Sequence, residues 1–419
     1  MRKSGLLALC LVLWFAPLGS VAADSQTSRV RSPGELAQTL SNAMQGGVLL
    51  LAGGDYGKLS LRDVRASDGS PLVLRSADPA NPARFSGMTL RDVHNVLLEN
   101  LVFDYTFREG DALSLRPFEI IRSSGVTIRN TVFDGDLARN RIQADDGFPT
   151  AFGLSVRQVS AFTLENTEIR TFYRGIVVSE SGDITVRGND LHDIRMDGMN
   201  FAQVEQVLIE NNHIHDFARS LTSKDHADMI QFWTASTTAP SQHIVIRDNI
   251  LNSGHGWYTQ SIFMRNELVD TGRAGAEMFY RDVTIANNVI LNAHAHGITI
   301  GETDGLTITN NSLLRNARSE GAKDHRSLWT PRISVAASSR NVTVARNVMS
   351  RIVGFENQGD WSLMRNLEIQ DHSRMKPGFY GMLFVNPLTG DPGDLSTFLP
   401  KKGGALDGTG LGADRLQRP

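Results

Sequence analysis

A short pattern recurs nine times in the central part of the chain: an alternating apolar strand, a small polar turn that often carries asparagine, and another apolar residue. The copies are VLLENLVF, VTIRNTVF, FTLENTEI, ITVRGNDL, VLIENNHI, IVIRDNIL, VTIANNVI, LTITNNSL and VTVARNVM, the last ending at Met349. Repetition of this kind is typical of a solenoid, in which each repeat packs against its neighbours. The pattern therefore restricts the chain to a small set of folds.

The spacing of the copies indicates the type of solenoid. The shortest intervals between equivalent turn residues are 22 residues, from Thr167 to Asn189, and 23 residues, from Asn189 to Asn212. A strand, helix and strand with their loops need more residues, whereas one coil of a parallel β-helix fits. The longer intervals are coils with inserted loops. We therefore predict an all-β fold, a single-domain parallel β-helix solenoid.

Alternation within each copy places apolar side chains on one face of the strand and polar side chains on the other. In coils stacked about 4.8 Å apart, the apolar faces form a continuous core. The asparagines then lie at equivalent corners and hydrogen-bond up and down the stack. We interpret them as structural rather than catalytic residues.

Residues 1–23 have the features of a signal peptide. Arg2 and Lys3 precede an apolar run that is too short to span a bilayer, and the segment ends in the small residues Val21-Ala22-Ala23. We predict an exported protein, periplasmic or secreted, with no membrane insertion. The single cysteine, Cys10, lies in this segment, so the mature chain has no disulfide, thiol nucleophile or cysteine-bound metal.

The remaining chain divides into three parts. Residues 24–92 are predicted to form an N-terminal cap and the first coils, with a short amphipathic helix in SPGELAQTLSNAMQ capped by Ser32. Residues 93–353 hold the β-helix repeats, and residues 354–419 a last degraded coil and a loop-rich C-terminal cap. Without Arg2 and Lys3, 40 basic residues stand against 45 acidic ones, a formal charge of −5. This charge argues against a nucleic-acid partner. We also predict that the protein is a monomer.

Each central coil contains a second strand, visible as GIVVS, GMNFA, MIQFW, SIFMR, GITIG and RISVA. Aligning these strands stacks the turns before them into one strip, predicted to face solvent and rich in ionisable groups. Such a density has no packing purpose on an exposed β-surface, so the strip is the candidate active site. It comprises Tyr173, Arg174, Arg195, Asp197, His226, Asp228, Tyr258, Gln260, His294 and His296, with Asn200, Gln231 and Arg265 beside them.

Two segments of adjacent coils carry most of the candidates, KDHADMIQFW (224–233) and GHGWYTQSIFMRNE (254–267). The predicted catalytic residues are His226, Lys224, Tyr258 and Arg265. The predicted substrate-binding residues are Arg174, Arg195, Gln231, Trp233, His255, Gln260 and His296. Asp197 and Asp228 are candidate ligands for Ca²⁺, the one cofactor considered.

His213 and His215, in NNHIHDF, alternate along a strand and resemble a pair of metal ligands. No third ligand is evident in the sequence, and His192 occupies the equivalent turn one coil earlier, which favours a repeated structural side chain. His243 and His325 have no acidic or aromatic neighbours that indicate chemistry.

Roughly residues 32–410 resemble the right-handed parallel β-helix superfamily. The features that carry this resemblance are the signal peptide, the helix that follows it, the strand before Gly54-Asp55-Tyr56-Gly57, and the repeat. This superfamily includes pectate-lyase-like polysaccharide lyases and mannuronan C5-epimerases, so the resemblance implies a right-handed solenoid and an acidic polysaccharide as substrate. Asp225-His226-Ala227-Asp228 is similar in composition to the Asp-Pro-His-Asp motif of the epimerases but differs in order. The Asn-Gly-x-Glu-x-Ile-Arg motif of chondroitinase-B-like alginate lyases is missing.

The chemistry predicted from these groups is β-elimination on a uronate-containing polysaccharide. Arginines (Arg174, Arg195 and Arg265) would withdraw charge from the uronate carboxylate, His226 or Lys224 would remove the C5 proton, and Tyr258 would protonate the leaving oxygen. Three alternatives remain open: C5-epimerisation, glycoside hydrolysis by the Asp197 and Asp228 pair, and a non-catalytic β-helix that binds polysaccharide.

Overall fold

The computed structural model describes residues 27–254, 259–315, 318 and 330–417. The predicted signal peptide lies outside these residues. Within them, no helix combines the length and apolar character needed to cross a bilayer.

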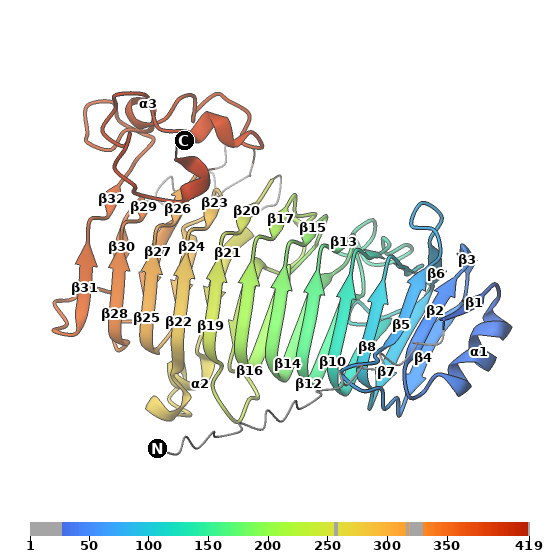
Figure 1. Cartoon of the computed structure of the whole chain (residues 1–419). Helices are drawn as coiled ribbons and strands as arrows, with labels where there is room; N and C mark the ends of the chain where they lie inside the picture. The colour runs from blue at the N-terminus through green and yellow to red at the C-terminus, as the bar shows by residue number, and fades with distance from the viewer. Residues whose placement is uncertain (1–26, 255–258, 316–317, 319–329, 418–419) are drawn as a thin grey trace, which may run out of the picture.

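The chain winds through three ladders of parallel strands that run along the molecule (Figure 1). Four long strands pass through both the first and the second ladder: β10 (Phe118–Arg129), β12 (Phe152–Glu165), β14 (Arg174–Arg187) and β16 (Met199–Glu210). Strand order within each ladder follows chain order, as in a β-helix with one strand per ladder in each coil.

The other strands of the first ladder are β1 (Thr27–Val30), β2 (Gly47–Leu51), β5 (Leu72–Ser76), β8 (His94–Glu99), β19 (Gln242–Arg247), β22 (Tyr280–Ala286), β25 (Thr303–Thr309), β28 (Arg340–Ala345) and β31 (Trp361–Met364). Those of the second are β4 (Lys58–Arg62), β7 (Gly87–Arg91), β18 (Ala227–Trp233), β21 (Thr259–Met264), β24 (His296–Ile300), β27 (Arg332–Val335) and β30 (Ile352–Val353). The third ladder contains β3 (Gly54–Asp55), β6 (Ala83–Phe85), β9 (Val102–Asp104), β11 (Val132–Asp134), β13 (Glu168–Arg170), β15 (Asp190–His192), β17 (His213–His215), β20 (Ile250–Asn252), β23 (Val289–Leu291), β26 (Ser312–Leu314), β29 (Val348–Met349) and β32 (Leu367–Glu368).

The predicted alignment of the second strands is confirmed. Ile176 pairs with Met199, and Met199 pairs with Ile230, which in turn pairs with Ile262. All four side chains are buried in one core cluster. Because side chains alternate along a strand, this register also fixes which residues lie on the outer face.

The predicted hydrogen bonding between asparagines of successive coils is also confirmed. These side chains form a continuous row of contacts, the asparagine ladder. Asn249 Oδ1 accepts hydrogen bonds from the backbone N and Nδ2 of Asn212, both at 2.9 Å, and Asn249 Nδ2 donates to Asn288 Oδ1 at 2.9 Å. The ladder extends into the degraded coil, where Asn366 Oδ1 accepts from Asn347 at 3.0 Å. The residue before each ladder position takes a left-handed conformation in several coils, as at Asn211 (φ 56°), which explains the frequent Asn-Asn pairs.

The predicted N-terminal helix is present as α1 (Pro33–Asn42). Ser32 caps it by accepting a hydrogen bond from the backbone N of Glu35 at 3.2 Å. Leu36 is buried, and Leu40 and Met44 pack against the core. The helix therefore covers apolar surface at the start of the solenoid (Figure 1).

The C-terminal segment folds back along the outer side of the third ladder (Figure 1). Its apolar residues form a second core cluster with Val289, Leu291, Leu314 and Val348, so these short strands are buried on both faces. The remaining helical elements are α2 (Glu267–Asp270), η1 (Ala276–Met278), α3 (Tyr380–Leu383), η3 (Leu395–Phe398) and η4 (Asp414–Leu416).

Candidate functional site

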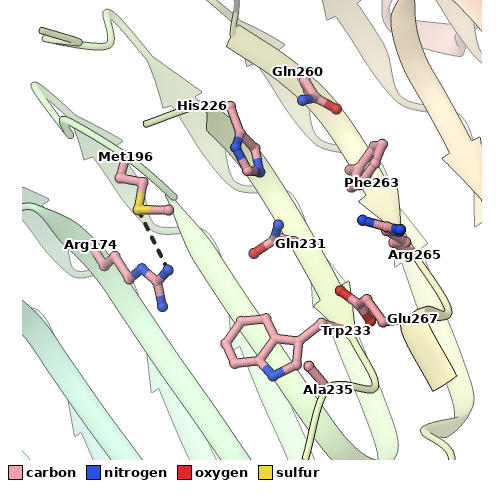
Figure 2. Close-up of a pocket in the computed structure, with 10 residues that line it drawn as sticks. All are labelled: Arg174, Met196, His226, Gln231, Trp233, Ala235, Gln260, Phe263, Arg265 and Glu267. Atoms are coloured by element: carbon pink, nitrogen blue, oxygen red, sulfur yellow. Dashed lines mark hydrogen bonds between the residues drawn. The ribbon is translucent and has the colours of Figure 1, made fainter. Parts of the chain in front are cut away.

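A groove of about 480 Å³ lies over the second ladder, across β14, β18 and β21 (Figure 2). Cationic, aromatic and amide side chains from successive coils converge on it, which suits a polar polymer better than an apolar ligand. Its lining residues are Arg174, Met196, His226, Gln231, Trp233, Ala235, Gln260, Phe263, Arg265 and Glu267.

Six of the residues predicted from the sequence line this groove: Arg174, His226, Gln231, Trp233, Gln260 and Arg265. Lys224 is exposed, but it is not among the lining residues. His296 lines an adjoining depression that shares Phe263 and Arg265 with the groove. His255 and Tyr258 lie outside the described residues.

Sequence reasoning missed four lining residues, Met196, Ala235, Phe263 and Glu267. A signal existed for Phe263, because it pairs in register with Gln231 and so lies on the same outer face. Glu267 belongs to α2, which follows the strand and whose position the repeat does not specify.

Two carboxyl groups lie beneath the groove. The prediction that Asp197 and Asp228 face solvent is wrong, because both side chains are fully buried. Glycine allows the close approach of the coils here: a Cβ at Gly198 would lie 2.6 Å from the backbone oxygen of Met229. Without exposed surface, the two carboxyl groups are not placed to flank a glycosidic bond, as a hydrolase mechanism requires.

Hydrogen bonds and one ion pair hold these carboxyl groups. Asp197 Oδ2 accepts from Asn200 Nδ2 at 3.0 Å and lies 3.1 Å from Arg174 Nε. Asp228 Oδ2 accepts from Gln231 Nε2 at 2.8 Å. Burial raises the pKa of Asp228 well above its ordinary value, and the neighbouring Asp197 raises it further.

This raised pKa predicts a pH-dependent gain in stability for Asp228→Asn. The native state holds the Asp228 proton more tightly than the unfolded chain does, so the favourable contribution is complete below the ordinary carboxyl pKa near 3.8 and is lost as the pH rises. The neutral amide avoids this loss. We expect the melting temperature of the variant minus that of the wild type to increase between pH 4 and pH 8, measured by circular dichroism. A difference that shrinks over this range would contradict the assignment.

His226 connects the groove with the buried carboxyl groups. Its side chain is 53% exposed, and its Nε2 lies 3.7 Å from Asp228 Oδ2. His226 directly precedes β18, and the first residues of that strand, Ala227 and Asp228, are buried. His226 is therefore the last exposed residue before this buried stretch. An imidazole beside a buried carboxyl group is an arrangement used for general acid and base catalysis.

Two arginines bring positive charge to the groove. Arg174 lies over the ring of Trp233, with its guanidinium carbon 5.7 Å from the ring centroid, and it also lies against Phe152 at 5.4 Å. Arg265 is 52% exposed and pairs with Asp270 at 2.7 Å. Both guanidinium groups can bind a carboxylate of a ligand. Arg265 would have to exchange its ion pair with Asp270 for the ligand, which costs little because that ion pair is exposed.

Arg195 has a different role from the one predicted. It is buried and pairs with Asp145 at 2.8 Å and with Asp225 at 2.9 Å, and its guanidinium lies over the ring of Tyr173 at 5.2 Å. Asp145 belongs to a loop inserted earlier in the chain. Arg195 therefore ties this loop to the solenoid and does not reach the groove.

The predicted Ca²⁺ site remains a prediction. Three buried side-chain oxygens, Asn200 Oδ1, Asp228 Oδ1 and Gln260 Oε1, accept no hydrogen bond from the described residues, which leaves these atoms free as cation ligands. However, Ca²⁺ takes 6–8 oxygen ligands, and the Arg174 guanidinium 3.1 Å from Asp197 already supplies positive charge at this position. The residues thus fit a cation only in part.

Residues 138–264 match a family described as a right-handed β-helix region. The fold is a right-handed parallel β-helix. The matched part includes β12 to β21 and therefore most of the groove. Among curated proteins, none matches the chain.

Several solved structures resemble the β-helix weakly. The surface adhesin PfbA of Streptococcus pneumoniae shares 12% identity with a TM-score of 0.46, over 83% of this chain and 95% of the adhesin. An alginate lyase from Paenibacillus sp. str. FPU-7 shares 12% identity with a TM-score of 0.41, over 81% and 97%. The periplasmic alginate epimerase AlgG shares 12% identity with a TM-score of 0.44, over 80% and 89%. An adhesin, a lyase and an epimerase give similar values, so these similarities do not distinguish between activities.

Proposed function

We propose that the protein is an exported enzyme that acts on a uronate-containing polysaccharide by removing the C5 proton, with β-elimination as the outcome. The observation that carries this proposal is His226, an exposed imidazole 3.7 Å from the buried Asp228 in a groove with two arginines. The alginate lyase and the alginate epimerase that resemble this fold are compatible with such a substrate.

In this reaction His226 takes the C5 proton, and the electron pair of the C5–H bond forms the C4–C5 double bond. The bond from C4 to the glycosidic oxygen breaks, and that oxygen receives a proton. Asp228 acts as a positioning residue that stabilises the imidazolium formed on His226. Tyr258 keeps its predicted role as the proton donor.

The C5 proton becomes acidic only when charge is withdrawn from the neighbouring carboxylate. Arg174 is suited to this, because its guanidinium is held by Asp197 and Trp233, while its side chain is 21% exposed and lines the groove. Arg265 lies on the opposite side of Gln231 (Figure 2), where it can bind the carboxylate of an adjacent sugar. Trp233 and Phe263 offer flat apolar surface to the sugar rings.

A panel of polymers tests the proposal: the purified protein is incubated with alginate, pectate, glucuronan and glycosaminoglycans while the ultraviolet absorbance of the unsaturated product is followed. We expect absorbance to rise on at least one polyuronate. New reducing ends without absorbance would indicate hydrolysis, and exchange of the C5 proton in heavy water without cleavage would indicate epimerisation. Binding without any turnover would support a non-catalytic role. Repeating the assay with a chelator and with added Ca²⁺ tests the cation.

A further inference from the structure

A cluster of imidazole and carboxylate groups lies on the third ladder, away from the groove on the second. His213 and His215, two residues apart on β17, project from the same face of the strand, and Asp190 is the register partner of His213 on β15. The side chain of His213 is 46% exposed and that of Asp190 is 50% exposed, so a solvated ion can reach both. The sequence indicated the two histidines, and the structure supplies the third group from the preceding coil.

The distances within this cluster suit a shared ion. Asp190 Oδ1 lies 2.9 Å from His215 Nε2 and 3.5 Å from His213 Nδ1, and one ligand atom from each of the three side chains lies within 4.8 Å of the others. Ligand atoms bound to Zn²⁺ at about 2.0–2.1 Å in a tetrahedron are about 3.3 Å apart. The two observed distances lie on either side of this value.

The surroundings of His215 fit a metal ligand as well. Its other ring nitrogen, Nδ1, lies 2.8 Å from Asp216 Oδ2. Ligand histidines commonly donate their second ring N–H to a carboxylate, which fixes the tautomer and the orientation of the ring. The ring also stacks on that of His213, with centroids 4.0 Å apart, and on that of His192, with centroids 5.1 Å apart. Asp216 and the stacked rings therefore hold Nε2 toward Asp190.

We propose that Asp190, His213 and His215 form a binding site for a divalent transition metal ion with the preferences of Zn²⁺. Imidazole and carboxylate ligands suit this class of ion, and water completes the coordination because the site is open. The ion replaces the proton between His215 Nε2 and Asp190 Oδ1. It joins two successive coils through their side chains, since Asp190 comes from one coil and both histidines from the next.

The test uses the mature protein without an affinity tag, after removal of metals with a chelator. Titration with ZnCl₂ by calorimetry is expected to show one bound ion per chain, and Co²⁺ is expected to give the visible absorption of a tetrahedral site. At a 100-fold excess of Zn²⁺ over the dissociation constant, the melting temperature is expected to rise by roughly 3–5 °C.

Variants assign the ion to these residues. His213→Gln and Asp190→Asn are each expected to weaken zinc binding by about 10-fold or more and to remove the Co²⁺ bands. His243→Gln is the matched control, because His243 is similarly exposed and lies 3.1 Å from Asp282 but has no second histidine in its contact. Unchanged binding in a His213→Gln/His215→Gln double variant that melts at the temperature of the metal-free wild type would overturn the proposal. Failure of the wild type to bind Zn²⁺ would overturn it too.

Discussion

Replacement of His226 by alanine is expected to lower kcat/KM on the responsive polyuronate by about 10²–10⁴-fold, the usual contribution of a general base. The substitution removes the exposed imidazole that takes the C5 proton, and the buried Asp228 cannot replace it because its side chain has no exposed surface. Because the side chain of His226 is 53% exposed, its loss creates little cavity and the fold is expected to persist. Steady-state rates from product absorbance, with circular dichroism on the same samples, measure both effects.

The matched control is His243→Ala, a second exposed histidine beside a carboxylate, 3.1 Å from Asp282 on the first ladder. Its activity is expected to equal that of the wild type. If His226→Ala retains full activity while His243→Ala behaves as expected, proton removal by His226 is wrong and another group in the groove must be the base. Activity lost in both variants would indicate damage to the fold rather than to chemistry.

Replacement of Asn249 by alanine is expected to have the largest effect on stability, a decrease of about 2–5 kcal/mol in the free energy of unfolding. Asn249 Oδ1 is the acceptor for both the backbone N and Nδ2 of Asn212, and its own Nδ2 donates to Ile209 O and Asn288 Oδ1. All these groups lie where water does not replace the lost partners. Urea unfolding followed by circular dichroism measures the loss.

Asn366→Ala provides the comparison, because Asn366 ends the ladder and is only partly buried. Water can hydrate the groups that its removal exposes, so we expect less than half the effect of Asn249→Ala. Equal losses in the two variants would contradict a cooperative ladder in which interior positions depend on neighbours on both sides.

Sequence periodicity predicted the fold and the register because each strand has one buried face. A slip of one residue would expose Met199 and Phe201 to water, so only one alignment with Ile176 and Val178 buries every apolar side chain. The same alignment correctly brought His226 and Arg265 to one groove from positions 39 residues apart. Repeats thus predict the neighbours of an outward-facing residue as well as those of a core residue.

Burial of polar groups was not predictable in this way. Asp197 and Asp228 lie under the groove because glycines let the coils approach closely at the start of the second ladder, and alternation of apolar residues does not report such contacts. Arg195 is enclosed by Asp145 from an inserted loop, and inserts follow no period. Asp190 was overlooked beside His213 because only the register of the short third-ladder strands makes them neighbours.

The returning C-terminal segment changes how the solenoid can come apart. In a simple solenoid each coil is held only by the next, so the end coils can fray one at a time. Here the backbone N of Ala413 donates to Ser312 Oγ at 2.9 Å, and Arg415 Nη2 donates to Asn211 Oδ1 at 2.9 Å, a contact between residues 204 positions apart. The C-terminal segment therefore links several coils to one another. The last coils can separate from the middle of the molecule only after these hydrogen bonds break.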